Sequence, residues 1–239
     1  MSEVSEIYKV LTKKKYNRNS PFLPAEIKKI ITRCVKSKVP IPLIGFWGIG
    51  FKSQINWADE ATCDFFNKLN QEVSKAYSQG ILFTFILAIP HGLHNGVSKE
   101  TIENYLTGVK SLFEKNGFNW IILDDLWRGH GISFEEIDKE LKRKPKDWWT
   151  KMDNAAILEK RAAERNQRLS PKLAAQKYVV MRELEKPMLE TQFKGQIFHA
   201  FADSGFKNVL PHMPILFLYS YKKGRSASPW FIYESRKKN

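Results

Sequence analysis

The chain has 239 residues, of which 43% are hydrophobic and 13% aromatic, and this composition excludes a globally disordered protein. The formal net charge of +14 predicts an anionic partner, such as nucleic acid, a membrane surface or an acidic protein, unless the lysines are only solvated. No apolar stretch approaches the roughly 20 residues of a membrane span, and no secretory signal is present, so we expect a cytoplasmic protein. Cys34 and Cys63 lie in helix-like patterns without metal-type spacing, which indicates small core residues in a reducing compartment.

Residues 1–38 are predicted to form a helical extension of a single domain that spans 1–239. A short amphipathic helix is expected within 1–20, and a second helix over 24–37. Pro24 suits the first turn of that second helix, and its isoleucines recur at helical spacing.

Three apolar runs, 41–48, 81–89 and 119–123, are typical of buried strands. Helical patterns over 57–78 and from Ser98 to Gly117 separate them. Alternating strands and helices imply right-handed crossovers and a parallel sheet with helices on both faces. The sequence therefore predicts an α/β fold of the Rossmann-like class.

A basic helical segment is predicted over 133–191, beginning with a capping box at Ser133. Two later apolar runs, 214–221 and 229–233, are expected to complete the sheet as further strands.

In open α/β sheets the ligand lies beyond the carboxyl ends of the strands. We therefore expect a pocket built by the segments that follow the predicted strands. The glycine turn over 45–50 is not a dinucleotide fingerprint. It either reverses the chain or brings backbone amides and a lysine towards a carboxylate or phosphate. The candidate pocket residues are Trp47, Gly48, Gly50, Lys52, Ser53, His91, His94, Asn95, Asp124, Asp125 and Tyr219.

Asp124 and Asp125 follow the third predicted strand and could bind an ammonium group, orient a hydroxyl group or hold Mg²⁺. Because adjacent side chains point different ways, we expect at most one of them to face the pocket; helix capping is the alternative. His91 and His94 have no Cys or acid nearby, which favours hydrogen bonding over zinc. We predict no metal and no cofactor.

The stretch 139–177 places cations beside Trp148 and Trp149, a pattern that suits phosphate contact and base stacking. Interspersed Glu residues favour a solvated helix with i,i+4 pairs, but the excess positive charge is concentrated in this stretch. We favour RNA contact. The candidate RNA-binding residues are Lys142, Arg143, Lys144, Lys146, Lys151, Arg161, Arg165 and Arg168.

The segments 44–56, 83–96, 177–187 and 215–221 resemble those of tRNA-dependent cyclodipeptide synthases. The resemblance implies a monomeric aminoacyltransferase that makes a cyclic dipeptide (a diketopiperazine of secondary metabolism) from aminoacyl-tRNA, without a cofactor. It assigns hydrogen bonds to the ester carbonyl to Tyr178 and Tyr219. Ammonium binding and proton transfer fall to Glu183 with Asp124 or Asp125.

The chain departs from that family at two positions. Trp47-Gly48 stands where the acyl-accepting serine is expected, so Ser53 is the nearest hydroxyl and direct attack by the second amine is favoured. Glu183 also follows Tyr178 one position late. The divergent arginine-dependent branch of the family fits these departures better than the bacterial type.

The segments 51–56, 58–61 and 76–80 are similar to isonitrile synthases of the dityrosine and pyoverdine type. That resemblance implies an enzyme that acts on a free amino acid. A non-enzymatic RNA-binding module remains the third alternative.

Overall fold

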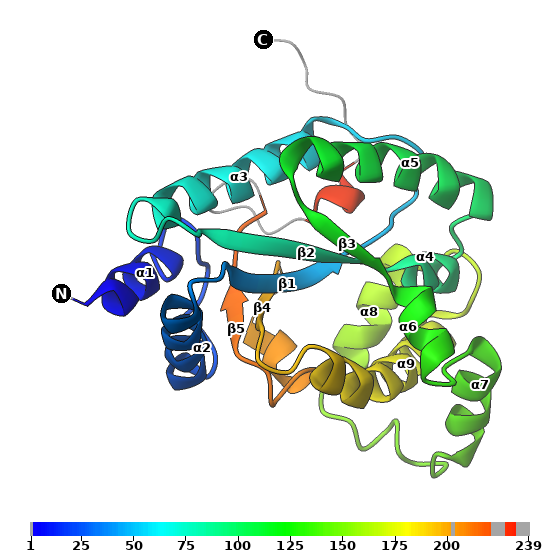
Figure 1. Cartoon of the computed structure of the whole chain (residues 1–239). Helices are drawn as coiled ribbons and strands as arrows, with labels where there is room; N and C mark the ends of the chain where they lie inside the picture. The colour runs from blue at the N-terminus through cyan, green and yellow to red at the C-terminus, as the bar shows by residue number, and fades with distance from the viewer. Residues whose placement is uncertain (1, 202–203, 221–227, 233–239) are drawn as a thin grey trace.

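The computed structural model describes residues 2–201, 204–220 and 228–232. Its centre is a sheet in which the strand order is β3-β2-β1-β4-β5 and every neighbouring pair is parallel (Figure 1). This confirms the predicted α/β, Rossmann-like fold. The strands are β1 Ile41–Trp47, β2 Ile81–Leu87, β3 Asn119–Ile122, β4 Ile197–Ala200 and β5 Ile215–Phe217.

Helices cover both faces of the sheet: α3 and α5 lie on one side, and α6 and α9 on the other (Figure 1). The α-helices are α1 Glu3–Leu11, α2 Pro24–Ser37, α3 Trp57–Ser74, α4 Ile89–Asn95, α5 Lys99–Asn116, α6 Leu123–Gly129, α7 Phe134–Arg143, α8 Ala155–Arg165 and α9 Pro171–Gln192. Two short 3-10 helices follow, η1 Ser204–Asn208 and η2 Pro229–Phe231.

The central strand β1 is apolar on both faces because both faces are covered. Leu43 and Trp47 point to the core beneath α3 and α5. Ile44 and Phe46 point to the core beneath α6 and α9. Successive side chains of a strand alternate between the two faces of the sheet. The last two residues of β1, Phe46 and Trp47, therefore lie in different cores.

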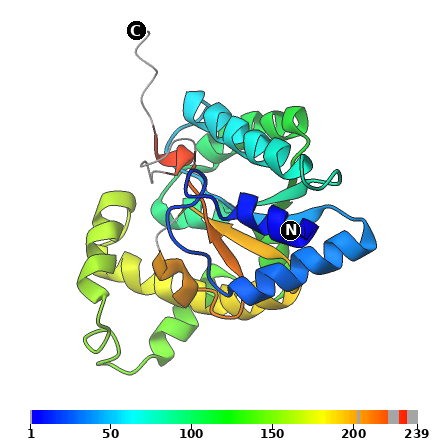
Figure 2. The ribbon, with the colours of Figure 1, turned by 90° about the vertical axis from the view of Figure 1, so that its left-hand side faces the viewer.

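The N-terminal extension is attached to the far edge of the sheet. Helices α1 and α2 pack together, and α1 also packs on α3. Between them, Asn17 and Phe22 form antiparallel bridges with Leu218 and Ile215 of the β5 segment. Figure 2 shows the two helices side by side on the face turned towards the viewer.

The second predicted strand was too long, because β2 ends at Leu87. The segment predicted as its loop contains helix α4, in which Pro90 occupies the first turn and Gly96 ends the helix with a positive φ. The residues after β3 also form a short helix, α6.

The late strands differ most from the prediction. Strand β4 was not predicted, and only 215–217 of the run 214–221 pairs as a strand. The predicted strand over 229–233 is wrong, because Pro229–Phe231 is a 3-10 helix that packs on α3. Residues 221 and 233, at the ends of these two predictions, lie outside the described part of the chain.

The two cysteines are buried and unpaired, as predicted. Among the described helices, none combines the length and apolar composition that a bilayer crossing requires.

Candidate functional site

The strand order reverses at β1, because the chain adds β2 and β3 on one side and β4 and β5 on the other. A topological switch point of this kind is where parallel α/β sheets bind ligands, beyond the carboxyl ends of the strands. The residues that directly follow β1, β2 and β3 are therefore the first candidates for a ligand-binding site.

The buried carboxylate of Glu185, on α9, accepts hydrogen bonds from side chains in the segments that follow β2 and β3. His91 donates from Nε2 to Glu185 Oε1 at 2.8 Å, and Trp127 Nε1 donates to the same oxygen at 3.0 Å. Arg182 Nη1 donates to Oε2 at 2.5 Å. We call Phe46, His91, Trp127, Arg182 and Glu185 the His91–Glu185 cluster.

Arg182 is only partly used by these contacts. Its guanidinium lies 4.7 Å from the ring centre of Phe46 and 5.7 Å from that of Phe206. Nη1 also lies 3.4 Å from His91 Nε2. Nε and Nη2 are buried and have no hydrogen-bond partner in the described structure, although the side chain is 7% exposed. One edge of a buried guanidinium is therefore unsatisfied, which is rare in folded proteins.

The charges in the cluster hold Glu185 ionised. Burial alone would raise the pKa of Glu185, but the charges of His91 and Arg182, together with hydrogen bonds from His91 and Trp127, outweigh burial and lower it. A buried carboxylate with this set of partners can hold and orient a proton-transferring imidazole.

The structure separates the two adjacent aspartates after β3. Asp125 is exposed and pairs with Arg128 at 3.1 Å. Asp124 is half-buried, and its Oδ2 atom is buried without a partner among the described residues. Burial raises the pKa of Asp124, while the nearby charge of His91 acts in the opposite direction. The inward carboxylate therefore lies within electrostatic range of the cluster.

Two further predicted residues border the cluster. The ring of Tyr178 lies 5.9 Å from that of His91 and 6.2 Å from that of His94. His94 is buried with Nε2 3.1 Å from the carbonyl of Ala174, and burial lowers its pKa to about 4. Asn95 ends α4, and its carbonyl accepts from the amide of Gln167. These contacts hold α4 against α9 and against the segment between α8 and α9.

Glu183 and Tyr219 are not brought to this place. Glu183 is exposed and pairs with Lys144 at 2.6 Å. Tyr219 is partly buried against the core of the α3 and α5 face, and its amide donates to the carbonyl of Tyr16. Their predicted catalytic roles have no geometric support from the described contacts.

The sequence interpretation overlooked Arg182 and Glu185. The signal that could have found them is spacing, because Tyr178, Arg182 and Glu185 stand at i, i+4 and i+7, which places them on one face of a helix. Trp127 and Phe46 carried no such signal, since an isolated aromatic residue usually belongs to a core.

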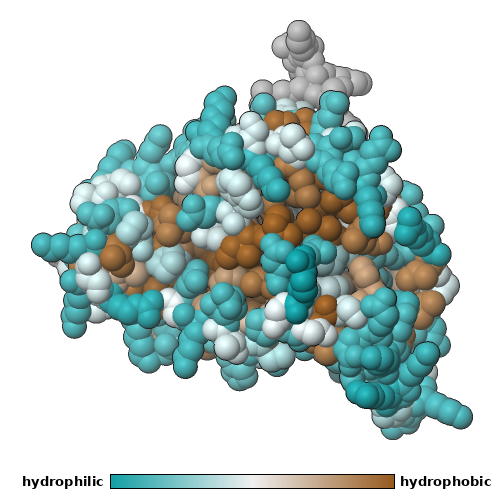
Figure 3. Space-filling view, turned by 45° about the vertical axis from the view of Figure 1, so that its right-hand side comes forward, coloured by the Kyte–Doolittle hydropathy of each residue, from teal (hydrophilic) through white to brown (hydrophobic). Residues whose placement is uncertain are grey.

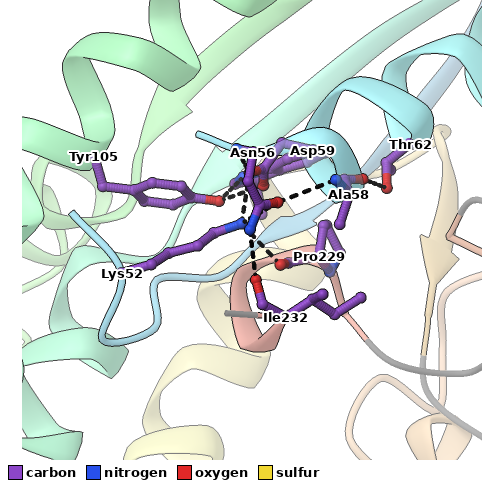
Figure 4. Close-up of polar contacts among 9 residues, drawn as sticks. Lys52, Asn56, Ala58, Asp59, Thr62, Tyr105, Pro229 and Ile232 are labelled. Atoms are coloured by element: carbon purple, nitrogen blue, oxygen red, sulfur yellow. Dashed lines mark hydrogen bonds and ion pairs between the residues drawn. The ribbon is translucent and has the colours of Figure 1, made fainter. Parts of the chain in front are cut away.

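Lys52 lies in a second polar group, on the α3 side of β1 (Figure 4). Its Nζ donates to Asp59 Oδ2 at 2.5 Å, to the carbonyl of Pro229 at 2.9 Å and to Asn56 Oδ1 at 3.2 Å. Tyr105 donates to the other oxygen of Asp59 at 2.7 Å. All three ammonium protons are engaged and the side chain is buried, so Lys52 anchors η2 rather than reaching a ligand.

The glycine-turn residues that were predicted to line the pocket are also buried. Trp47 is buried and donates from Nε1 to the hydroxyl of Tyr105 at 3.1 Å. A Cβ added at Gly48 would lie 2.4 Å from the indole of Trp230, and Gly50 is buried as well. Ser53 is exposed beyond the turn. The structure therefore assigns Trp47, Gly48, Gly50 and Lys52 to a buried anchor and His91 to the His91–Glu185 cluster. Ser53, Asp125 and Tyr219 belong to neither group.

Of the predicted RNA-binding residues, all but Lys144 are exposed. Arg143 and Lys151 form ion pairs with acids three or four residues away, as the alternative interpretation of a solvated helix expects. The part of the surface that protrudes at the lower right of Figure 3 is almost entirely hydrophilic.

A shallow groove of about 440 Å³ lies elsewhere, on the strands themselves. Apolar side chains reach the surface in the middle of the view in Figure 3. The groove holds no titratable group, and its lining is Thr84, Asn119, Trp120 and Ile121. Within the described residues, no group of three or more His, Cys, Asp or Glu side chains is placed to hold a metal ion.

The sequence matches no family model, and no curated protein is significantly similar to it. The fold is similar to that of the PvcA protein of Pseudomonas aeruginosa, with a TM-score of 0.63 and 14% identity over 94% of this chain and 87% of that one. It is also similar to the tyrosyl-tRNA synthetase of Archaeoglobus fulgidus, solved with L-tyrosine, with a TM-score of 0.51 and 12% identity. That alignment covers 91% of this chain and 63% of the synthetase, so this chain spans less than two thirds of the synthetase. At these identities the likeness shows a shared fold.

Proposed function

We propose that the chain is an enzyme that binds a free α-amino acid at the His91–Glu185 cluster and acts on its amino group. The observation that carries this proposal is the unsatisfied edge of Arg182, formed by Nε and Nη2. These two N–H groups point in parallel, and a carboxylate accepts both at once. Leaving them empty in a buried position costs free energy, so a ligand that fills them gains affinity.

The rest of Arg182 is already fixed for this role. Glu185 holds Nη1, and the ring of Phe46 supports the plane of the guanidinium. A side chain restrained in this way loses little conformational entropy when it binds a planar anion.

Asp124 supplies the complementary charge. Its unpartnered Oδ2 is an acceptor without a donor, and burial has raised the pKa of its carboxyl. An ammonium group at this oxygen would lower that pKa again and satisfy the acceptor. A zwitterionic amino acid offers a carboxylate for Arg182 and an ammonium group for Asp124 in one small molecule.

His91 is the candidate for proton transfer. Chemistry at an amine requires removal of an ammonium proton. An imidazole oriented by a carboxylate is suited to accept it in its neutral form, in which Arg182 rather than His91 supplies the positive charge beside Glu185. His91 is 14% exposed at its side chain and is oriented by Glu185. The exposed ring of Tyr178 borders the same place and can contribute a hydroxyl group.

The fold supports the same substrate class. The synthetase with this fold was solved with L-tyrosine, and the resemblance to isonitrile synthases implies a free amino acid as substrate. The chain also covers most of the length of the PvcA protein, whose fold it shares.

Aminoacyl transfer from tRNA is the second candidate, favoured by the exposed cations over 142–168. The two candidates differ in the form of the amino acid. An aminoacyl ester has no free carboxylate, so it cannot use the edge of Arg182 in the way that a free amino acid can.

Binding of amino acids and their methyl esters tests the choice. A panel of amino acids would be screened by thermal shift and then measured by calorimetry against the matching methyl esters and decarboxylated amines. We expect the free acid to bind at least about tenfold more tightly than either derivative, because charged hydrogen bonds of this kind contribute about 1.5–3 kcal/mol.

Matched variants locate the site. Asp124→Asn should weaken amino acid binding, whereas Asp125→Asn, which changes an exposed side chain one residue away, should not. Ester binding equal to or tighter than that of the free acid would contradict the proposal and favour aminoacyl transfer.

A further inference from the structure

Half of the net charge of the chain lies in its N-terminal extension. Residues 1–38 contain ten Lys and Arg and three Asp and Glu, a net charge of 10 − 3 = +7 out of +14. The helical region 133–191 contains fourteen basic and eleven acidic residues, which leaves 14 − 11 = +3. Within it, the stretch 139–177, where RNA contact was predicted, contains twelve basic and five acidic residues, a net charge of 12 − 5 = +7. The extension therefore carries as much excess positive charge as that stretch.

The outer face of α2 is a row of cations. Its isoleucines point to the core, so the opposite face is exposed. Glu26 is the single acid of this helix, and it pairs with Lys29. The exposed basic residues of α2 and its C-cap are Lys28, Lys29, Arg33, Lys36 and Lys38.

Helix α1 extends the row. It packs on α2, and Nζ of Lys28 lies 4.7 Å from the ring centre of Tyr8 across the junction. Lys9 of α1 and Lys14, which follows that helix, are exposed as well. Within the described part of the chain, Lys9, Lys28 and Lys36 have no ion pair. We call Lys9, Lys14, Lys28, Lys36 and Lys38 the N-terminal basic face.

We infer that the N-terminal basic face binds the phosphate backbone of RNA. Helix α2 has 14 residues and is therefore about 20 Å long, a length over which one strand of a duplex carries about six phosphates. Unpaired, exposed lysines release counterions from such a backbone without having to break existing ion pairs.

The composition of this face favours a nucleic acid over the other anionic partners. The apolar side chains of α1, Ile7, Val10 and Leu11, are buried in the core, so the helix has nothing to insert into a bilayer. A protein partner would be expected to meet aromatic or apolar residues at the centre of the interface. Val39, next to Lys38, is an exposed apolar side chain at the end of this face, but one such residue does not form the centre of a protein interface. The lysines match a regular array of phosphates.

This surface is distinct from the amino acid site. Helix α2 ends just before β1 begins, at the amino edge of the sheet, whereas the His91–Glu185 cluster lies beyond the carboxyl edge. RNA binding at the N-terminal basic face therefore goes beyond the proposed function and does not depend on it.

Salt titration with matched triple variants tests the inference. The affinity of the full chain for a labelled single-stranded RNA would be measured by anisotropy at several salt concentrations. Lys9→Gln, Lys28→Gln and Lys36→Gln together should reduce the slope of log affinity against log salt by about 2, at about 0.7 for each lost phosphate contact. The control triple, Lys142→Gln, Lys146→Gln and Arg168→Gln, removes the same charge from the 133–191 region and should leave the slope nearly unchanged.

Three outcomes would overturn the inference. The first is no RNA binding by the unmodified chain at low salt. The second is a loss in the control triple as large as that in the first triple, which would move the contact to 133–191. The third is binding to anionic phosphatidylserine vesicles that depends on the N-terminal lysines while RNA binding does not. Thermal melting of both triples should match the unmodified chain, since all the changed residues are exposed.

Discussion

Glu183 and Glu185 stand two residues apart on α9 and lie in opposite surroundings. Glu183 is exposed and pairs with Lys144, whereas Glu185 is fully buried between His91, Trp127 and Arg182. The helix alone produces this contrast, because two residues along an α-helix correspond to a rotation of about 200°.

The contrast predicts different costs for the same substitution. Glu185→Gln removes a buried charge and leaves Arg182 uncompensated, so unfolding free energy should fall by about 3–5 kcal/mol. Glu183→Gln breaks an exposed pair and should change it by less than about 1 kcal/mol. Denaturant unfolding of both variants measures the difference, and equal costs would show that Glu185 is not buried as described.

Acid should destabilise the fold before carboxyl groups titrate. Burial lowers the pKa of His94 to about 4 and that of His199 to about 3. Below about pH 6.5, the ordinary pKa of histidine, these two side chains bind protons in the unfolded chain but remain neutral in the folded chain. The unfolding free energy therefore falls as the pH falls. The two histidines together should contribute a slope approaching about 2.7 kcal/mol per pH unit below pH 6.

Variants separate this contribution from the others. His94→Gln and His199→Leu should each reduce the dependence of unfolding free energy on pH, between pH 6.5 and 5, by up to about 1.4 kcal/mol per pH unit, the equivalent of one proton. Chemical unfolding at each pH measures this dependence. That window lies above the range in which the lowered pKa values of Glu72 and Glu185 matter. An unchanged slope in both variants would contradict their burial as neutral groups.

Lys52 is predicted to be a structural anchor. Lys52→Met leaves Asp59 buried without its cation, so unfolding free energy should drop by about 3–5 kcal/mol. Ser53→Ala changes the next residue, which is exposed, and should cost less than about 0.5 kcal/mol. Thermal and denaturant unfolding compare the two. A folded Lys52→Met protein should still bind the amino acid. Complete loss of binding would show that Lys52 contributes to the binding site.

Gly45 and His199 should be coupled. The imidazole of His199 lies across Gly45, and a Cβ added there would lie 2.4 Å from Nε2. Gly45→Ala alone should therefore destabilise the fold by about 1–3 kcal/mol through overpacking. In the double variant with His199→Ala the clash disappears, so the two costs should not add. Strict additivity in a double-mutant cycle would rule out the contact.

The sequence predicted the first half of the fold well. Strands β1, β2 and β3 are apolar runs separated by clear helices, and such runs identify buried parallel strands. Strand β4 was missed because it has only four residues and contains His199, whose burial depends on the glycine opposite it in β1. The run 229–233 has strand-like composition, but Pro229 begins a 3-10 turn that is held in place by Lys52 and Asn56.

The predicted site at the carboxyl edge stays a prediction, but the structure shows which of the named side chains lie near one another there. Position after a strand identified His91 and Asp124. It could not identify Glu185, which comes from a helix ninety-four residues away from His91 in the sequence. Nor could it show that Lys52, also after a strand, is neutralised by Asp59.

The two strands that pair with β1 are synthesised at very different times after it. β1 pairs with β2 forty residues later, but its other neighbour, β4, arrives more than 150 residues later. Until then one side of the central strand is an open edge, with unpaired amides and carbonyls and a strongly apolar composition. Closure of so long a loop makes folding slow. During synthesis the partly made chain must pass through a stage in which its apolar central strand has only one neighbour.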